Sequence, residues 1–205
     1  MQRTTLRDGS LATFRNRSKS TNQPPLRVVG VDGGALPVGN RIGKTALVAV
    51  LLEGPRIVNL KLGRIVVDGV DALPVLLSLL KGLTYDFVML SGIAFAGFNL
   101  IDIKKLARRV RKPVIAVIRE KPNNRAVRQA LRKHFPDWRR RWVMVEHAGP
   151  LYTCKPVSDE PRLYFEVSGA SPAFARRVVV SSSFVSRLPE PIRVAGILVK
   201  GLRGG

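Results

Sequence analysis

The segment Asp86–Glu120 constrains the fold more than any other part of this 205-residue chain. Two short apolar runs, Phe87–Leu90 and Val114–Ile118, are typical of strands buried on both faces. Between them lie a glycine-rich loop and an amphipathic stretch that predicts a helix, with Asn99 as its cap and Pro113 after its end. Two buried strands joined by a helix predict a parallel crossover unit, in which function lies beyond the carboxyl ends of the strands.

The loop that follows the first of these strands is therefore the first candidate for a functional site. It contains Ser91 directly after the strand, and then two phenylalanines and an asparagine that we expect to border a cleft, namely Phe95, Phe98 and Asn99.

Patterns in the rest of the chain predict three strands with short connections, followed by mixed helices and strands. Strands are expected over Leu26–Val31, Lys44–Leu52, Arg56–Val67, Trp142–Glu146 and Leu163–Val167. Helices are expected over Gly69–Leu80, Asn123–Phe135, Pro172–Val180 and Pro189–Leu202. An antiparallel three-strand meander joined to parallel strands is an α/β mixed sheet flanked by helices, and this order of elements is that of the ribonuclease-H-like fold.

The first 25 residues differ from the rest of the chain. They are polar, contain five basic residues and one acid, and end in two prolines. This composition predicts a flexible basic tail over residues 1–25, before a single domain over residues 26–205. An organellar transit peptide or a start site placed too far upstream are alternatives for the tail.

The net charge of +21 and the pI of about 11.5 indicate a polyanionic partner, such as nucleic acid, or a very basic cellular interior. More than half of this charge comes from residues 104–141, where fifteen basic side chains face only Glu120 and Asp137. We predict a phosphate-binding face there, and the alternative is a solvated charged face. The candidates are Arg108, Arg109, Arg111, Lys112, Arg125, Arg128, Arg132 and Trp138.

Other compositional features exclude several classes of protein. No apolar run approaches the roughly 18 residues that cross a bilayer, so a membrane partner is not expected. Cys154 is the only cysteine, which excludes a disulfide framework and makes a reducing, cytoplasmic setting the default.

Three aspartates are candidates for a catalytic metal site. Asp32 ends a buried strand and could hold Mg²⁺ or Mn²⁺, or it could be a turn residue that accepts backbone hydrogen bonds. Asp68 and Asp71 flank the start of a predicted helix, where they could cap its backbone donors or complete a metal pair with Asp32. Asp102 fits a capping role better.

The segment Gly39–Thr45 is similar to a phosphate-binding loop, but only three residues separate its glycines and a strand follows it. The genuine motif has four such residues and precedes a helix. A glycine-rich hairpin with an incidental lysine is therefore the preferred interpretation.

Several longer motifs resemble an uncharacterised archaeal family, the domain of unknown function ninety-nine. They are Arg27–Gly34 (RVVGVDGG), Val67–Ala72 (VDGVDA), Met89–Asn99 (MLSGIAFAGFN), Lys112–Val117 (KPVIAV), Arg132–Trp138 (RKHFPDW), Ala148–Tyr152 (AGPLY) and Leu188–Ala195 (LPEPIRVA). That family is itself similar to endonuclease V, a Mg²⁺-dependent nuclease that cuts near deaminated bases. The resemblance implies a ribonuclease-H-like fold and makes Asp32 the counterpart of the first-strand metal ligand.

The chain departs from that pattern at two positions. Ser91 stands where the nuclease has an aspartate, and Gly33 stands where relatives often have a second acid. We therefore expect a nucleic-acid-binding protein whose catalysis is weakened or lost, with Asp32 as a weak or vestigial metal ligand. The alternatives are a working Mg²⁺- or Mn²⁺-dependent endonuclease that uses Asp32 with Asp68 or Asp71, and an interaction protein that does not bind nucleic acid.

Overall fold

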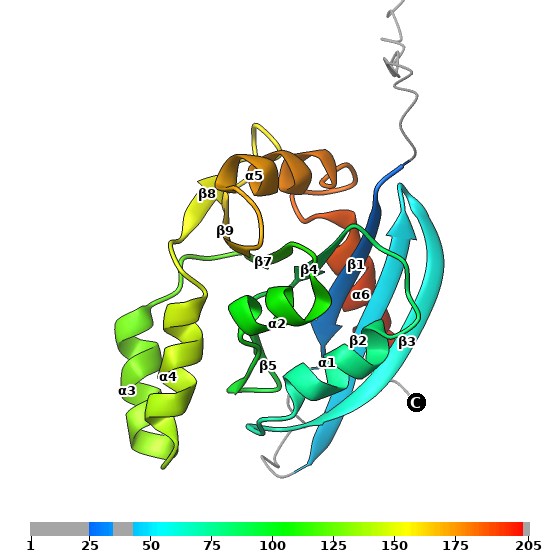
Figure 1. Cartoon of the computed structure of the whole chain (residues 1–205). Helices are drawn as coiled ribbons and strands as arrows, with labels where there is room; N and C mark the ends of the chain where they lie inside the picture. The colour runs from blue at the N-terminus through cyan, green and yellow to red at the C-terminus, as the bar shows by residue number, and fades with distance from the viewer. Residues whose placement is uncertain (1–24, 35–42, 203–205) are drawn as a thin grey trace, which may run out of the picture.

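A computed structural model describes residues 25–34 and 43–202 of the protein. Their main feature is a seven-stranded sheet with the strand order β3-β2-β1-β4-β7-β9-β8 (Figure 1). Its strands are β1 (Arg27–Gly33), β2 (Lys44–Glu53), β3 (Arg56–Val66), β4 (Phe87–Leu90), β7 (Val114–Ile118), β8 (Tyr152–Cys154) and β9 (Leu163–Ser168). Strands β1, β4 and β7 run parallel, and the other neighbouring pairs are antiparallel. The predicted mixed α/β sheet is therefore confirmed.

Helices cover both faces of this sheet. The structure contains α1 (Ala72–Leu80), α2 (Ile103–Val110), α3 (Asn124–His134), α4 (Trp138–His147), α5 (Pro172–Ser181) and α6 (Glu190–Gly201). Buried residues of α1 and α2 share a core with Val29 and Val31 of β1. On the opposite face, α5 packs on β4 and β7, while α6 packs on β1 and β2. Because side chains alternate along a strand, Val28, Gly30 and Asp32 of β1 lie on this opposite face, and the backbone of α6 passes close to Gly30 and Asp32.

Helix α6 lies unusually close to β1. A Cβ atom added to Gly30 would lie 2.1 Å from the carbonyl oxygen of Pro191. A side chain at position 30 would therefore push the first turn of α6 away from the centre of the sheet.

Helices α3 and α4 form a pair at one side of the molecule (Figure 1), and α4 corrects the predicted strand over Trp142–Glu146. The apolar run there suggested a strand, but side-chain pairs four residues apart favour a helix. Asp137 forms an ion pair with Arg141, and the indole N–H of Trp142 donates to Glu146 at 2.7 Å. Such pairs meet on one face of a helix, whereas on a strand they would be far apart.

The sequence also missed three short strands, β8 and the hairpin of β5 (Ala94–Phe95) and β6 (Asn99–Leu100). The remaining predicted helices are confirmed with shifted ends. No helix in the two described ranges is long and apolar enough to span a membrane. The predicted basic tail falls almost entirely outside the described residues.

Glu166 of β9 is a buried carboxyl group with only 7% of its surface exposed. It pairs with Ala116 of β7 and therefore faces the same side of the sheet, where α2 packs. Its Oε2 atom has no hydrogen-bond partner, and burial raises the pKa of Glu166 to about 7.

We predict that Gly30→Ala destabilises the fold by about 1–3 kcal/mol, because the added methyl group overlaps the backbone of Pro191. Urea denaturation measures this change in the free energy of unfolding. Gly43→Ala is the matched control, because a Cβ atom at Gly43 would meet no atom within 4 Å. If Gly30→Ala and Gly43→Ala had the same free energy of unfolding, the close approach of α6 to β1 would be contradicted.

A second prediction concerns the pH dependence of stability. An ordinary glutamate pKa is 4.5, so between pH 4.5 and about 7 the folded state retains a proton at Glu166 that the unfolded state has lost. The contribution of the neutral carboxyl is therefore complete below pH 4.5 and is lost as the pH rises toward 7. Glu166→Gln keeps a neutral side chain at all pH values, so it should gain roughly 3 kcal/mol relative to wild type at pH 8 and nothing at pH 4. Denaturation at both pH values tests this, with the exposed Glu120→Gln as control.

Candidate functional site

Asp32 and Ser91 lie side by side at the carboxyl ends of β1 and β4. The parallel register pairs Val31 with Leu90, so the next residue of each strand is also adjacent. The hydroxyl group of Ser91 donates a hydrogen bond to Oδ1 of Asp32 at 2.5 Å, and the backbone N–H of Gly33 donates to the same oxygen at 2.8 Å. Ser91, which stands where the resemblance implies an aspartate, thus lies next to Asp32 in the structure.

These two residues line a cleft of about 570 Å³ between the carboxyl ends of the central strands and α6. Basic side chains, one acid and apolar side chains complete its wall: Arg119, Glu120, Lys200, Val117, Ile118, Leu188, Ile192 and Val199. A Cβ atom at Gly196 of α6 would lie 2.7 Å from Oδ2 of Asp32, so the helix backbone passes directly over the carboxylate.

Two opposing effects act on the Asp32 carboxyl group. Burial raises its pKa, and this effect is the largest. The hydrogen bonds from Ser91 and Gly33 and the positive charges of Arg119 and Lys200 lower the pKa, but less than burial raises it. The cleft therefore places two cations near the partly buried carboxyl group of Asp32.

The Mg²⁺ or Mn²⁺ ion implied by the resemblance does not fit this set of ligands. Such ions are held by several oxygen ligands, usually including more than one carboxylate where phosphoryl transfer occurs. In the described part of the chain, no three His, Cys, Asp or Glu side chains gather in a group that could hold a metal ion. Ser91 supplies a neutral hydroxyl whose proton is already donated to Asp32.

Asp68 and Asp71 do not line the cleft of Asp32. The Asp68 carboxylate accepts the backbone N–H of Phe98 at 2.8 Å, and Asp68 has a positive φ of 54°. The Asp71 carboxylate accepts the backbone N–H of Val66 at 3.1 Å and the side-chain amide of Asn99 at 2.6 Å. Both carboxylates thus hold loop and strand groups before α1. Neither caps the backbone donors of α1 as the sequence suggested, because Asp71 makes no side-chain cap hydrogen bond and the Ala72 N–H is bound by Asn99.

Asn99 has a different role from the predicted one. It is fully buried, and its side-chain oxygen accepts the N–H of Ala72 at 2.9 Å, at the start of α1. Its amide donates to the carbonyl of Val66 at 2.8 Å. The cap of α2 is instead Asp102, whose carboxylate accepts the N–H of Lys105 at 2.8 Å. Sequence spacing could not reveal a contact between residues 27 positions apart.

The two phenylalanines of the predicted cleft loop lie behind the cleft wall. Phe95 is buried, and a Cβ atom on Gly33 would lie 3.0 Å from its ring. Phe98 packs edge to face against Phe135, with 5.5 Å between ring centres. Phe95 therefore supports the strand end that carries Asp32, and Phe98 connects the loop to the α3–α4 pair.

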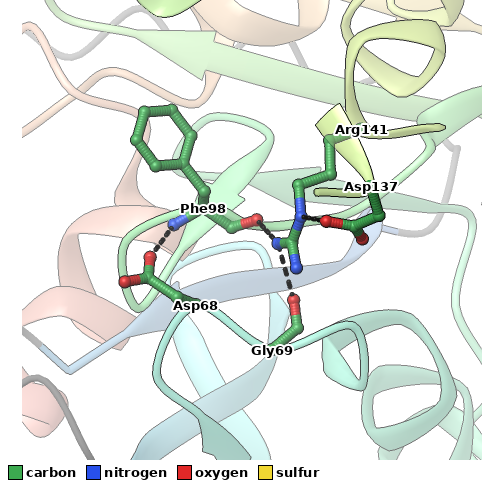
Figure 2. A network of polar contacts seen from close by, with 5 residues as sticks. All are labelled: Asp68, Gly69, Phe98, Asp137 and Arg141. Carbon is green, nitrogen blue, oxygen red and sulfur yellow. Dashed lines mark hydrogen bonds and ion pairs between the residues drawn. The ribbon is translucent and has the colours of Figure 1, made fainter. Parts of the chain in front are cut away.

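Arg141 joins α4 to the loops behind the cleft (Figure 2). It is only 6% exposed, and its guanidinium donates to the carbonyl oxygens of Phe98 at 2.6 Å and Gly69 at 3.0 Å. It also donates to Asp137 at 2.9 Å and lies 4.4 Å from the ring centre of Phe135. This arginine belongs to the basic run in the sequence, but in the structure it is buried and binds backbone carbonyls of two loops.

The exposed basic side chains fall into separate groups. Arg108, Arg111 and Lys112 line a shallow hollow of about 380 Å³ at the end of α2. Arg109 lines a different, largely apolar groove between α1, α2 and α4.

On α3, Arg125, Arg128 and Arg132 line a third hollow of about 430 Å³, together with Trp142 of α4. The predicted Trp138 lies beneath Arg132 and Arg139, at 5.4 Å and 4.8 Å from their guanidinium carbons. The structure thus divides seven of the eight predicted residues among three hollows, and Trp138 lines none of these three. The ring centre of Trp142, the other tryptophan beside the basic run in the sequence, lies 5.4 Å from the guanidinium carbon of Arg128.

Most of the glycine-rich segment, residues 39–42, lies outside the described residues. Lys44 begins β2 and is exposed. Because a strand and not a helix follows, the segment lacks the context of a phosphate-binding loop.

The mixed seven-stranded sheet with helices on both faces has the ribonuclease-H-like fold of endonuclease V. The sequence model of the endonuclease dU family matches residues 24–203, and the chain belongs to this family. The UPF0215 protein of Thermococcus gammatolerans is 37% identical over 189 residues, which cover 89% of this chain and 95% of that relative. Further UPF0215 relatives, from Thermococcus sibiricus and Methanopyrus kandleri, are each 33% identical.

Solved structures show the same fold. A protein of unknown function from Archaeoglobus fulgidus aligns with a TM-score of 0.76 at 26% identity, covering 86% of this chain and 98% of that chain. The catalytic domain of human endonuclease V aligns with a TM-score of 0.61 at 17% identity, covering 87% and 82%. Ciona intestinalis endonuclease V, in complex with DNA containing an inosine, aligns at 0.59 and 15% identity, covering 87% and 86%.

We predict that Arg141→Met loses about 3 kcal/mol of stability, because two carbonyl oxygens and Asp137 lose a buried cationic donor. Thermal and urea denaturation measure the loss. The exposed neighbour Arg140→Met removes the same charge and should be nearly neutral. A small effect for both variants would show that the α3–α4 pair does not depend on Arg141.

Proposed function

We infer that this protein binds nucleic acid through the exposed basic side chains of α2 and α3, and that its Asp32–Ser91 cleft is a weakened endonuclease site. The observation that carries this proposal is the pairing of Asp32 with a serine hydroxyl where the fold offers room for a second acid. A carboxylate pair would attract a divalent cation, whereas the serine satisfies Asp32 by hydrogen bonding alone.

The surface charge supports the binding part of the proposal. The arginines of α2 and α3 are exposed, and within the lining of their two hollows no carboxylate opposes them. Arginine forms bidentate contacts with phosphate and suits the tracking of a nucleic-acid backbone. The DNA-bound endonuclease V of Ciona intestinalis supports nucleic acid as the class of partner.

A working divalent-metal-dependent endonuclease is the second candidate, favoured by membership of the endonuclease dU family. In this candidate Asp32 and Glu120, which both line the cleft, are the nearest carboxylates to a scissile phosphate. Arg119 and Lys200 suit the charge of that phosphate in either candidate.

A cleavage assay distinguishes the two candidates. Plain, deoxyuridine-containing and inosine-containing DNA and RNA are incubated with Mg²⁺ or Mn²⁺ and with wild type, Asp32→Ala or Ser91→Asp. We expect weak or no cutting by wild type and metal-dependent cutting by Ser91→Asp, because the variant adds a second carboxylate beside Asp32. Efficient cutting by wild type that Asp32→Ala abolishes would establish the working endonuclease.

A salt titration tests binding independently of cutting. The logarithm of the binding constant should fall linearly with the logarithm of salt concentration, by about 0.9 for each phosphate contact. The double variant Arg108→Ala with Arg111→Ala should make this slope shallower by about 2. A binding constant that does not respond to salt, or no binding at all, would refute the proposal.

A further inference from the structure

Two arginine–tryptophan pairs connect α3 to α4. Trp138 and Trp142 are four residues apart and therefore lie on the same face of α4, one turn from each other. Arg128 and Arg132 have the same spacing on α3. Arg128 lies over Trp142 and Arg132 over Trp138, each with its guanidinium carbon 5.4 Å from the ring centre. The two helices thus carry two stacked pairs, about 6 Å apart along the helix axis.

The groove beside the Arg128–Trp142 pair is lined by aromatic, cationic and amide groups. Its volume is about 430 Å³, and it is lined by one indole ring, three guanidinium groups and two carboxamides, from Trp142, Arg125, Arg128, Arg132, Asn124 and Gln129. No carboxylate is among these residues. The indole N–H of Trp142 donates to Glu146 at 2.7 Å, which holds the ring in one orientation at the groove.

The chemistry of this lining matches an unpaired nucleotide. An aromatic face accepts a base by stacking, arginines accept phosphates, and carboxamides form hydrogen bonds with base edges. A base within a duplex cannot use its faces in this way, because they are stacked against its neighbours. By contrast, the hollow at the end of α2 contains Lys104, Arg108, Arg111 and Lys112 but no aromatic ring, so it suits phosphates alone.

Neighbouring chain segments link the groove to the cleft. Residues 117–120 line the cleft, and α3 begins at Asn124, only four residues after Glu120. Arg141 of α4 holds the carbonyl of Phe98, in the loop after β4. The same chain segments that position the cleft therefore position the groove.

We propose that the α3–α4 groove is a binding site for single-stranded nucleic acid, which stacks a base on Trp142 and places phosphates on Arg125, Arg128 and Arg132. This proposal rests on the proposed nucleic-acid-binding function and adds its substrate class, an unpaired strand.

The test measures affinity for a fluorescein-labelled mixed-sequence DNA strand, both free and annealed to its complement. Trp142→Leu should weaken binding of the free strand about tenfold, which corresponds to about 1.4 kcal/mol, and leave duplex binding nearly unchanged. Trp142→Phe retains an aromatic face and should recover most of the affinity. Binding of the free strand should also quench the intrinsic tryptophan fluorescence of wild type, because stacking changes the surroundings of the ring.

Arg108→Met is the matched control, because it removes one exposed cation from the hollow that lacks an aromatic ring. It should weaken free-strand and duplex binding by the same factor. Circular dichroism identifies any variant that fails to fold, and in that case the comparison of Trp142→Phe with wild type carries the test.

Three outcomes would overturn the proposal. If Trp142→Leu leaves the ratio of free-strand to duplex affinity unchanged while Arg108→Met weakens both, the groove assignment fails and the proposed function stands. If neither free strand nor duplex binds, both fail together. If polyglutamate competes with the free strand at equal charge concentration, and its binding depends equally on Trp142, the groove recognises an acidic peptide and base stacking is excluded.

Discussion

The close approach of α6 to β1 is the constraint on which the rest of the structure depends. Gly30 admits the backbone of Pro191, and Gly196 admits the carboxylate of Asp32, so the helix lies against the strand at both ends of the contact. The approach seals the centre of the sheet and also buries Asp32. The same packing that stabilises the fold therefore raises the pKa of the carboxyl group at the proposed site.

Much of the sheet was predictable because its central strands are buried on both faces and appear as continuous apolar runs. β4 and β7 were located from such runs, and in the structure the parallel register of β1 and β4 places Ser91 beside Asp32. The errors have two causes, a contact between distant residues at Asn99 and local side-chain pairs in α4. Asn99 caps a helix that begins 27 residues earlier, and α4 is stabilised by side-chain pairs that an apolar pattern does not reveal.

The basic run from residue 104 to residue 141 shows how little linear charge says about the role of each cation. Arg141 is buried and holds two loop carbonyls, whereas Arg128 and Arg132 cover tryptophan rings. Arg108 and Arg111 are exposed beside other cations. A count of charges predicted a basic face, but burial and neighbours divide that run into a buried arginine that binds loop carbonyls, arginines stacked on tryptophans, and exposed cations beside other cations.

The Ser91 hydroxyl explains how the cleft is stable without a strongly charged partner for Asp32. Two carboxylates side by side would repel each other and would require a cation or a shared proton. Ser91 and Gly33 instead donate to one oxygen of Asp32, and Arg119 and Lys200 supply diffuse positive charge. An arrangement satisfied by its own hydrogen bonds has little need of a divalent ion, while its two cations still attract a phosphate. This is why, in the proposed function, the cleft holds a nucleic-acid backbone more readily than it breaks one.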